Sequence, residues 1–267
     1  MIEILSLGAG VQSSCVLRMS IHGELPKLDH VIFADTGWEP AAVYEHLEVL
    51  KVEAKEAGIP LHVVQYQDIR IGALEAMDKT NFNPLPVFNK SPNGTKAGMT
   101  RRQCTREYKV APIENFVRRS VLGIKPRCHA PKEPVVRQWI GISLDELQRA
   151  KPSRVPWKSH WFPLIDRKIR REGCQEWMEE RGYGRAPRSA CIGCPYKDNR
   201  EWGDMRQAVK AEWTDACEFD ERLRDNHDPK GEMYLHRSLV PLSEVDLDPD
   251  RDQLRFWDDE CEGLCGV

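Results

Sequence analysis

Short apolar runs alternate with helix-patterned segments along the first 70 residues of the chain. Three such runs occupy residues 2–7, 30–34 and 61–66. Between the second and the third, four residues recur at the spacing of one helix face: Tyr44, Leu47, Leu50 and Ala54. Strands that alternate with helices in this way predict a parallel sheet, whose ligands bind at the carboxyl ends of the strands.

The remaining sequence continues the sheet and then becomes mainly helical. A further strand is predicted at 135–142, and helical segments are predicted at 105–121, 171–182 and 198–224. Residues 81–100, rich in Pro, Gly and Asn, are expected to form a loop over the ligand-binding edge, and 150–168 to be irregular. Ser143 is expected to cap a helix together with Glu146.

These elements together predict an α/β fold. We expect a Rossmann-like parallel sheet with helices on both faces, followed by a helical C-terminal extension. The ligand-binding domain that contains this sheet would span residues 1–168. Residues 169–267 would form a helical, cysteine-bearing region that packs on this domain rather than an independent unit.

Composition indicates the compartment and the type of chemistry. The 267 residues carry a formal net charge of −3, and no apolar run approaches the ~20 residues that span a bilayer. The start of the chain lacks the basic segment and cleavage site of a signal peptide, so we expect a cytoplasmic protein with no membrane partner. Nine cysteines in that compartment favour metal, iron–sulfur or thiol chemistry over stable disulfides.

Glycine and serine residues follow the first predicted strand in the stretch SLGAGVQSS. Glycines let backbone N–H groups turn toward a ligand, and a helix N-terminus adds partial positive charge. The predicted phosphate site consists of Ser6, Gly8, Gly10, Gln12, Ser13 and Ser14. A plain tight turn fits the same pattern. Asp35, Thr36 and Gly37 end the second strand, where an acid can meet a ribose or an adenine edge, and Gly141 ends the strand at 135–142.

Two cysteines in the turn Cys191-Ile-Gly-Cys194 can direct their thiolates to one point, and Cys104 would supply a third ligand. Zinc normally takes four protein ligands, or three and a water, whereas an iron–sulfur cluster on three cysteines leaves one iron open. A pair of buried thiols is the plain alternative. Cys128 and Cys174 are the spare candidates for a fourth ligand.

Basic residues surround Cys104 and also occur later in the chain. Arg101, Arg102 and Lys109 are predicted to neutralise phosphate or cluster charge. Residues 154–161 interleave basic and aromatic side chains, which suits either a surface that stacks nucleobases or a lid whose tryptophans pack. We favour the lid.

Six stretches occur in one order: SLGAGVQSS, FADTG, CTREYKVAPI, GISLDELQR, FPLID and CIGCPY. In this order the chain resembles, over roughly residues 1–200, the PP-loop ATP pyrophosphatases. More narrowly it resembles the phosphoadenosine-phosphosulfate-reductase-like branch of the adenine nucleotide alpha-hydrolase superfamily. The resemblance implies a HUP-type sheet that binds ATP with Mg²⁺ and cleavage between the alpha and beta phosphates. It also implies a 4Fe–4S cluster on Cys104, Cys191 and Cys194.

Two departures from the family pattern stand in these stretches. Gln12 occupies a place where the family loop commonly has an aspartate, and Gln103 precedes Cys104 where the cluster-bearing reductases have a second cysteine.

Three functions are compatible with this sequence. The first is an ATP pyrophosphatase that adenylates a substrate for sulfur insertion, with a nucleic acid as acceptor (tRNA thiolation or DNA phosphorothioation) and a cysteine desulfurase or another sulfur donor. The second is a sulfonucleotide reductase that uses thioredoxin and a C-terminal cysteine, Cys261 or Cys265. The third is a nucleotide-binding subunit of a defence complex. In the first function these two cysteines would carry persulfide or complete the cluster ligands.

Overall fold

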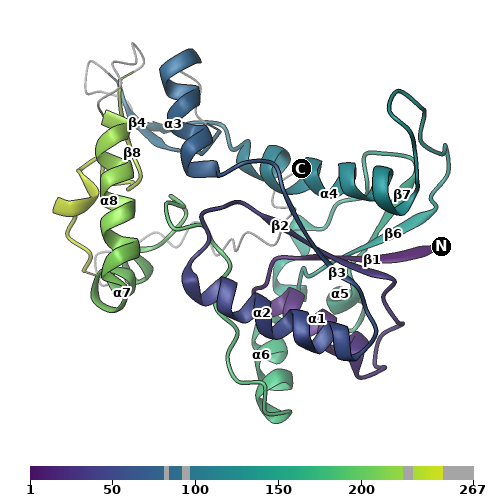
Figure 1. The fold of residues 1–267 in the computed structure, drawn as a ribbon. Helices are drawn as coiled ribbons and strands as arrows, with labels where there is room; N and C mark the ends of the chain where they lie inside the picture. The colour runs from purple at the N-terminus through teal and green to yellow at the C-terminus, as the bar shows by residue number, and fades with distance from the viewer. Residues whose placement is uncertain (81–83, 92–96, 225–230, 249–267) are drawn as a thin grey trace.

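A five-stranded, all-parallel sheet forms the centre of the protein, as the computed structural model shows (Figure 1). The structure describes residues 1–80, 84–91, 97–224 and 231–248. The strands lie in the order β3-β2-β1-β6-β7. Their bounds are β1 Ile2–Leu7, β2 His30–Asp35, β3 Leu61–Gln65, β6 Val136–Ile140 and β7 Lys158–Trp161. The predicted α/β class with a parallel sheet is confirmed.

Strand β1 lies at the middle of this sheet because apolar residues cover both of its faces. Ser6 is paired with Ile32 of β2 on one side and with Ile140 of β6 on the other. Alternate residues enter different cores, with Ile4 in the cluster under α4 and Leu5 in the cluster under α1 and α2. Both neighbours are parallel to β1, so the loops after all three strands leave from one edge of the sheet.

Helices cover both faces of the sheet. Figure 1 shows α1 (Val11–Ile21), α2 (Ala41–Glu56) and α6 (Arg171–Glu180) on one face and α4 (Ala111–Phe116) on the other. The short α5 (Pro163–Asp166) follows β7. Among the helices that the structure describes, none combines the length and apolar character that a membrane crossing requires.

A second core forms away from the sheet. It joins α3 (Ile69–Thr80) to α7 (Asn199–Ala208) and α8 (Lys210–Arg224), with Trp202 and Phe219 fully buried at its centre. Helix α7 begins with a capping box, in which Asp198 and Glu201 each accept a hydrogen bond from the other residue's backbone N–H. The helical C-terminal extension is thus present. The boundary predicted at residue 168 stays a prediction.

Three local expectations are wrong. Within 81–100, the described residues form β4 (Phe88–Lys90) and β5 (Ala97–Met99), and β4 also pairs with β8 (Glu232–Tyr234). Residues 150–168 contain β7 and α5. Ser143 makes no side-chain cap on the 3₁₀ helix Leu144–Arg149, because its hydroxyl accepts a hydrogen bond from the Gln12 side chain instead.

The helix predicted at 105–121 has an unusual start. Its first part, Thr105–Val110, is π-helical, the α-helical part begins at Ala111, and Val117–Val121 is again π-helical. Pro112 therefore lies in the first turn of the α-helical part, where its missing N–H costs little. Wide π turns often mark functional sites, and this one carries Lys109.

A buried ion pair joins α1 to α2. The Arg18 side chain is 2 % exposed, and its guanidinium donates through Nε and Nη2 to the two carboxylate oxygens of Glu53, both at 2.9 Å. The guanidinium also lies over the Tyr183 ring, 4.0 Å from its centroid. Such a pair is costly to break because the remaining charge stays buried.

We expect Glu53→Gln to lower the free energy of unfolding by about 3 kcal/mol, since it leaves the Arg18 charge uncompensated in the core. Glu48→Gln on the same helix is the matched control, because Glu48 pairs with Lys51 in solvent, and it should cost under about 0.5 kcal/mol. Urea unfolding of the two variants measures the difference. If both variants lost the same free energy of unfolding, the Arg18–Glu53 pair would not be the interaction that links α1 to α2.

Candidate functional site

The loop after β1 is compact and preformed. Ala9 adopts a left-handed conformation (φ 55°), and the Gly8 N–H donates to the Ser13 hydroxyl at 3.1 Å. Helix α1 begins at Val11, directly beyond Gly10. Its N-terminus therefore lies at the carboxyl edge of the sheet, where partial positive charge favours an anion.

Three of the predicted loop side chains are occupied by protein partners. The Gln138 amide donates to the Ser6 hydroxyl at 2.5 Å, and the Gln12 amide donates to the Glu146 carboxylate at 3.0 Å. The Ser14 hydroxyl is hydrogen-bonded to the His46 ring at 3.0 Å. These side chains therefore fix the loop, and its backbone N–H groups are the donors best suited to a phosphate.

Asp35 shapes the turn after β2. Its Oδ1 accepts hydrogen bonds from the Gly37 N–H at 2.7 Å and from the Tyr44 hydroxyl at 2.8 Å. Burial and the Asp35 carboxylate both raise the pKa of Tyr44, so this hydroxyl stays a donor. Gly37 has φ +74°, and a Cβ there would lie 2.9 Å from the Cα of Asp68. Only glycine fits that position.

The three predicted cysteine ligands line one cavity. Cys104 comes from the start of the helix at 105–121, and Cys191 and Cys194 come from the turn before α7. Thr36, Arg102 and Lys109 share this cavity, with an apolar wall formed by Ile69, Leu85 and Pro86. None of the seven cysteines in the described ranges forms a disulfide. Sequence positions almost 90 residues apart therefore converge at the ligand-binding edge of the sheet.

The cysteine turn is held against the sheet at two places. The Ser189 hydroxyl donates to the Gly8 carbonyl of the loop after β1, and the Ile192 N–H donates to the Trp38 carbonyl at 2.9 Å. A Cβ on Gly193 would lie 2.1 Å from the Trp38 ring, so the turn requires glycine there. The loop and the cysteines thus form one connected site.

Glu39, which the sequence analysis did not select, is the buried acid of this site. Its Oε1 lies 3.3 Å from the Lys109 ammonium, 3.0 Å from the Thr36 hydroxyl that donates to it and 3.6 Å from the Cys191 sulfur. Its Oε2 is buried and has no hydrogen-bond partner among the described residues. Glu39 is the second residue after FADTG, so extending that stretch by two residues would have included it.

Lys197 is a second residue that the sequence analysis missed. Its ammonium donates to the Cys191 carbonyl, and burial lowers the pKa of Lys197 although the Cys194 and Cys191 sulfurs raise it. Lys109, which lines the cavity, and Lys197, which binds the cysteine turn, thus place two amino groups around the thiols.

The three thiols are donors of the kind that an iron–sulfur cluster takes. Within the described ranges, no three His, Cys, Asp or Glu side chains stand close enough together to hold one metal ion. Tetrahedral zinc needs its sulfurs at ~2.3 Å from the metal, and hence about 3.8 Å apart. An iron–sulfur cluster spreads its thiolates over several irons and needs no such convergence. Three thiols around one cavity fit the chemistry of that group.

The other predicted residues are placed as follows. Arg101 is exposed and does not line the cysteine cavity, unlike Arg102 and Lys109. Gly141 is buried just beyond the end of β6. The spare ligand Cys174 lies in the core between α1 and α6, and Cys128 is exposed. Cys261 and Cys265 lie outside the described residues.

Comparison with known proteins gives no family assignment. No protein-family model matches the chain, and a search of curated proteins finds none with significant similarity.

Buried neutral histidines make the folded state sensitive to acid. Burial lowers the pKa of His46, next to Ser14, to about 4, and it lowers the pKa of His236 to about 4 as well. An unfolded histidine has a pKa of ~6.5. Between these two values the unfolded chain binds protons that the folded chain does not, so stability falls with decreasing pH.

We expect the free energy of unfolding to decrease from pH 6.5 to pH 4, by about 1–2 kcal/mol for each imidazole after allowance for partial solvent access. The double variant His46→Gln, His236→Gln should show a shallower decrease, measured by urea unfolding at several pH values. His129→Gln is the control because His129 is exposed. If the free energy of unfolding of the double variant fell as steeply with pH as that of the wild type, His46 and His236 would not be the cause of the acid sensitivity.

Proposed function

We propose that the protein is an ATP pyrophosphatase of the PP-loop type, which adenylates a substrate for sulfur insertion. The observation that carries the proposal is the single cavity lined by Cys104, Cys191 and Cys194, at the same sheet edge as the loop after β1. Three thiols close to the loop after β1 support a combination of sulfur chemistry and phosphate binding. The resemblance of six sequence stretches to this family supports the same function.

Different residues of the chain would bind the phosphates, bind the nucleoside and stabilise the charge of the leaving pyrophosphate. Backbone N–H groups of residues 9–13, at the start of α1, would hold the phosphates. The backbone of the turn held by Asp35 would bind the nucleoside. Lys109 and Arg102, which line the cavity, would stabilise negative charge as pyrophosphate leaves. Arg101, exposed beside them, would assist from the surface.

A 4Fe–4S cluster held by the three cysteines would supply an iron able to carry the sulfur that is transferred. Lys109 and Lys197 would balance the thiolate charge, while the apolar wall of the cavity would exclude water. A nucleic acid is the proposed acceptor, and a cysteine desulfurase or another sulfur donor would reload the site. The reductase and the defence-complex subunit stay predictions that no observation of the structure favours.

We expect anaerobically purified protein to contain iron and sulfide and to absorb near ~400 nm, as thiolate-bound clusters do. Cys104→Ala, Cys191→Ala and Cys194→Ala should each lose most of the iron, because three ligands leave no spare thiolate. Cys128→Ala is the matched control, as this cysteine is exposed and outside the cavity. Absence of iron from the wild type, or retention of iron in all three variants, would remove the cluster from the proposal.

We also expect pyrophosphate release from ATP, stimulated by RNA or DNA. Lys109→Gln should lower kcat about 100-fold, since it removes a buried charge from the site where negative charge develops. Lys132→Gln, at an exposed position, is the control and should leave the rate unchanged. Sulfite release from adenylyl sulfate with thioredoxin, in place of pyrophosphate release, would establish the reductase instead.

A further inference from the structure

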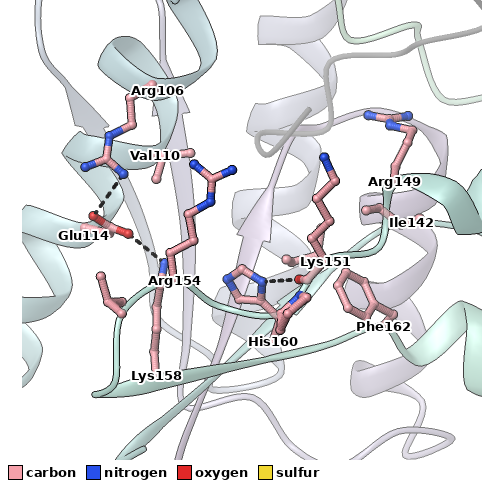
Figure 2. Close-up of a pocket in the computed structure, with 13 residues that line it drawn as sticks. Arg106, Val110, Glu114, Ile142, Arg149, Lys151, Arg154, Lys158, His160 and Phe162 are labelled. Atoms are coloured by element: carbon pink, nitrogen blue, oxygen red, sulfur yellow. Dashed lines mark hydrogen bonds and ion pairs between the residues drawn. The ribbon is translucent and has the colours of Figure 1, made fainter. Parts of the chain in front are cut away.

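A second pocket, with a strongly basic lining, lies beside β7 and the carboxyl end of β6 on the α4 face of the sheet. Figure 2 shows its lining side chains. Its cationic side chains are Arg106, Arg149, Lys151, Arg154 and Lys158. The lining residues come from 106–114, 140–142 and 149–162, and none comes from the phosphate loop or the cysteine turn. The pocket is therefore distinct from the site described above.

The positive charge of this pocket is only partly compensated. Glu114 lies 3.0 Å from the Lys158 ammonium and 3.9 Å from the Arg106 guanidinium, and Glu146 pairs with Arg149. Among the described residues, these ion pairs set two carboxylates against five cations. No described acidic side chain pairs with Lys151 or Arg154, which are both exposed at the rim. A pocket with this excess charge attracts an anion.

An apolar wall stands beside the cations. Val110, Ile140 and Ile142 form a small buried cluster, against which Phe162 packs, and all four line the pocket. Figure 2 shows Ile142 and Phe162 near Lys151. Val110, Ile140 and Ile142 are buried, and half-buried Phe162 offers the apolar surface that a ligand can reach. The lining therefore suits a ligand that carries both an anionic group and an apolar ring or sugar face.

His160 adds a requirement for a hydrogen-bond donor. Its Nδ1 lies 2.9 Å from the Lys151 carbonyl oxygen, which can only accept, so Nδ1 carries the proton (Figure 2). Burial, together with nearby Lys158, lowers the pKa of His160, which keeps the ring neutral and makes Nε2 an acceptor. This Nε2 is buried and has no hydrogen-bond partner among the described residues. A ligand hydroxyl or amine would satisfy it.

Two hydrogen-bonded chains connect this pocket to the phosphate loop. Ser6 accepts from Gln138, which in turn accepts from the Lys158 ammonium at 2.7 Å. In the second chain, Gln12 donates to Glu146, which pairs with Arg149. Lys158 and Arg149 are therefore oriented by the residues that fix the loop, and the two sites are neighbours on one sheet edge.

We propose that this pocket is a second nucleotide-binding site. The nucleotide's phosphate binds to the cations Lys151, Arg154 and Lys158, its ring lies on the apolar wall, and a hydroxyl or amine donates to His160 Nε2. The source of the nucleotide is either a free mononucleotide or one unit of a nucleic-acid strand. Binding at this site needs neither ATP cleavage nor a cluster, so it stands apart from the function proposed above.

Calorimetric titration of the full chain, without ATP and at one low salt concentration, tests the site with two probes: AMP and a single-stranded oligoadenylate. Lys151→Ala, Arg154→Ala as a double variant should bind about tenfold more weakly, through loss of charge-assisted contacts to phosphate. Lys55→Ala, Arg200→Ala removes two exposed cations from α2 and α7 and should bind like the wild type.

A second comparison tests His160. His160→Leu should weaken AMP binding about fivefold while leaving the binding of inorganic phosphate unchanged, and His160→Gln should retain more of the affinity for AMP because Gln keeps an acceptor. Tighter binding of the oligoadenylate than of AMP assigns the site to a strand, and equal binding assigns it to free nucleotide. Failure of wild-type protein to bind either probe, or equal affinities in the two double variants, overturns the proposal.

Discussion

The pairing of β1 with a parallel strand on each side is the constraint on which the rest of the molecule depends. Because β2 and β6 both run in the direction of β1, the loop at residues 8–10, the turn after Asp35 and the turn after Ile140 all leave from one edge. Every group assigned to phosphate or sulfur chemistry then needs only to reach that edge. The cysteine turn does so through Ser189 and Ile192, which bind backbone carbonyls of the first two of these loops.

Charged side chains are buried at this edge of the sheet, and burying them costs desolvation free energy. Lys109 and Glu39 are almost fully buried, and so is Lys158. Burying ion pairs gains little stability, since desolvation offsets the attraction. They are better understood as fixed charges, because Thr36 also binds Glu39 and Gln138 also binds Lys158. A site prepared in this way needs little rearrangement when a ligand's charge arrives.

The sequence was sufficient for features that depend on local patterns. Apolar runs found β1, β2, β3 and β6 to within about two residues, and glycine-rich or cysteine-rich stretches located the loop and the turn that meet at the edge. Features that depend on partners far away in the sequence were not predicted. The pairing of Phe88 with Tyr234 makes β4 a strand although its neighbourhood has a loop's composition. Ser143 failed as a helix cap because Gln12, from another element, uses its hydroxyl.

Buried charges were hard to find for the same reason. The roles of Glu39 and Lys158 depend on ion-pair partners that lie far away in the sequence. Glu39 pairs with Lys109, and Lys158 pairs with Glu114. Residues 154–161 show how far the sequence alone could predict such a region. We favoured a lid with packing tryptophans, and Trp157 does pack into the core under α4, yet Arg154, Lys158 and His160 from the same stretch line the basic pocket. Trp157 lies just before β7, whereas Lys158 and His160 share one face of that strand.

The loop after β1 and the basic pocket, which the two hydrogen-bonded chains connect, offer a ligand different kinds of hydrogen-bond donor. This difference affects what each site can bind. At the loop, Ser6, Gln12 and Ser14 are engaged with the protein, so a phosphate there meets backbone N–H groups whose directions are set by the fold. In the basic pocket, Lys151 and Arg154 are long side chains at an exposed rim. Backbone donors select one fixed phosphate geometry, whereas mobile cations accept phosphates in several positions. The proposed phosphate loop is thus suited to a ligand that always binds in one way, and the proposed second site to a nucleotide whose position varies.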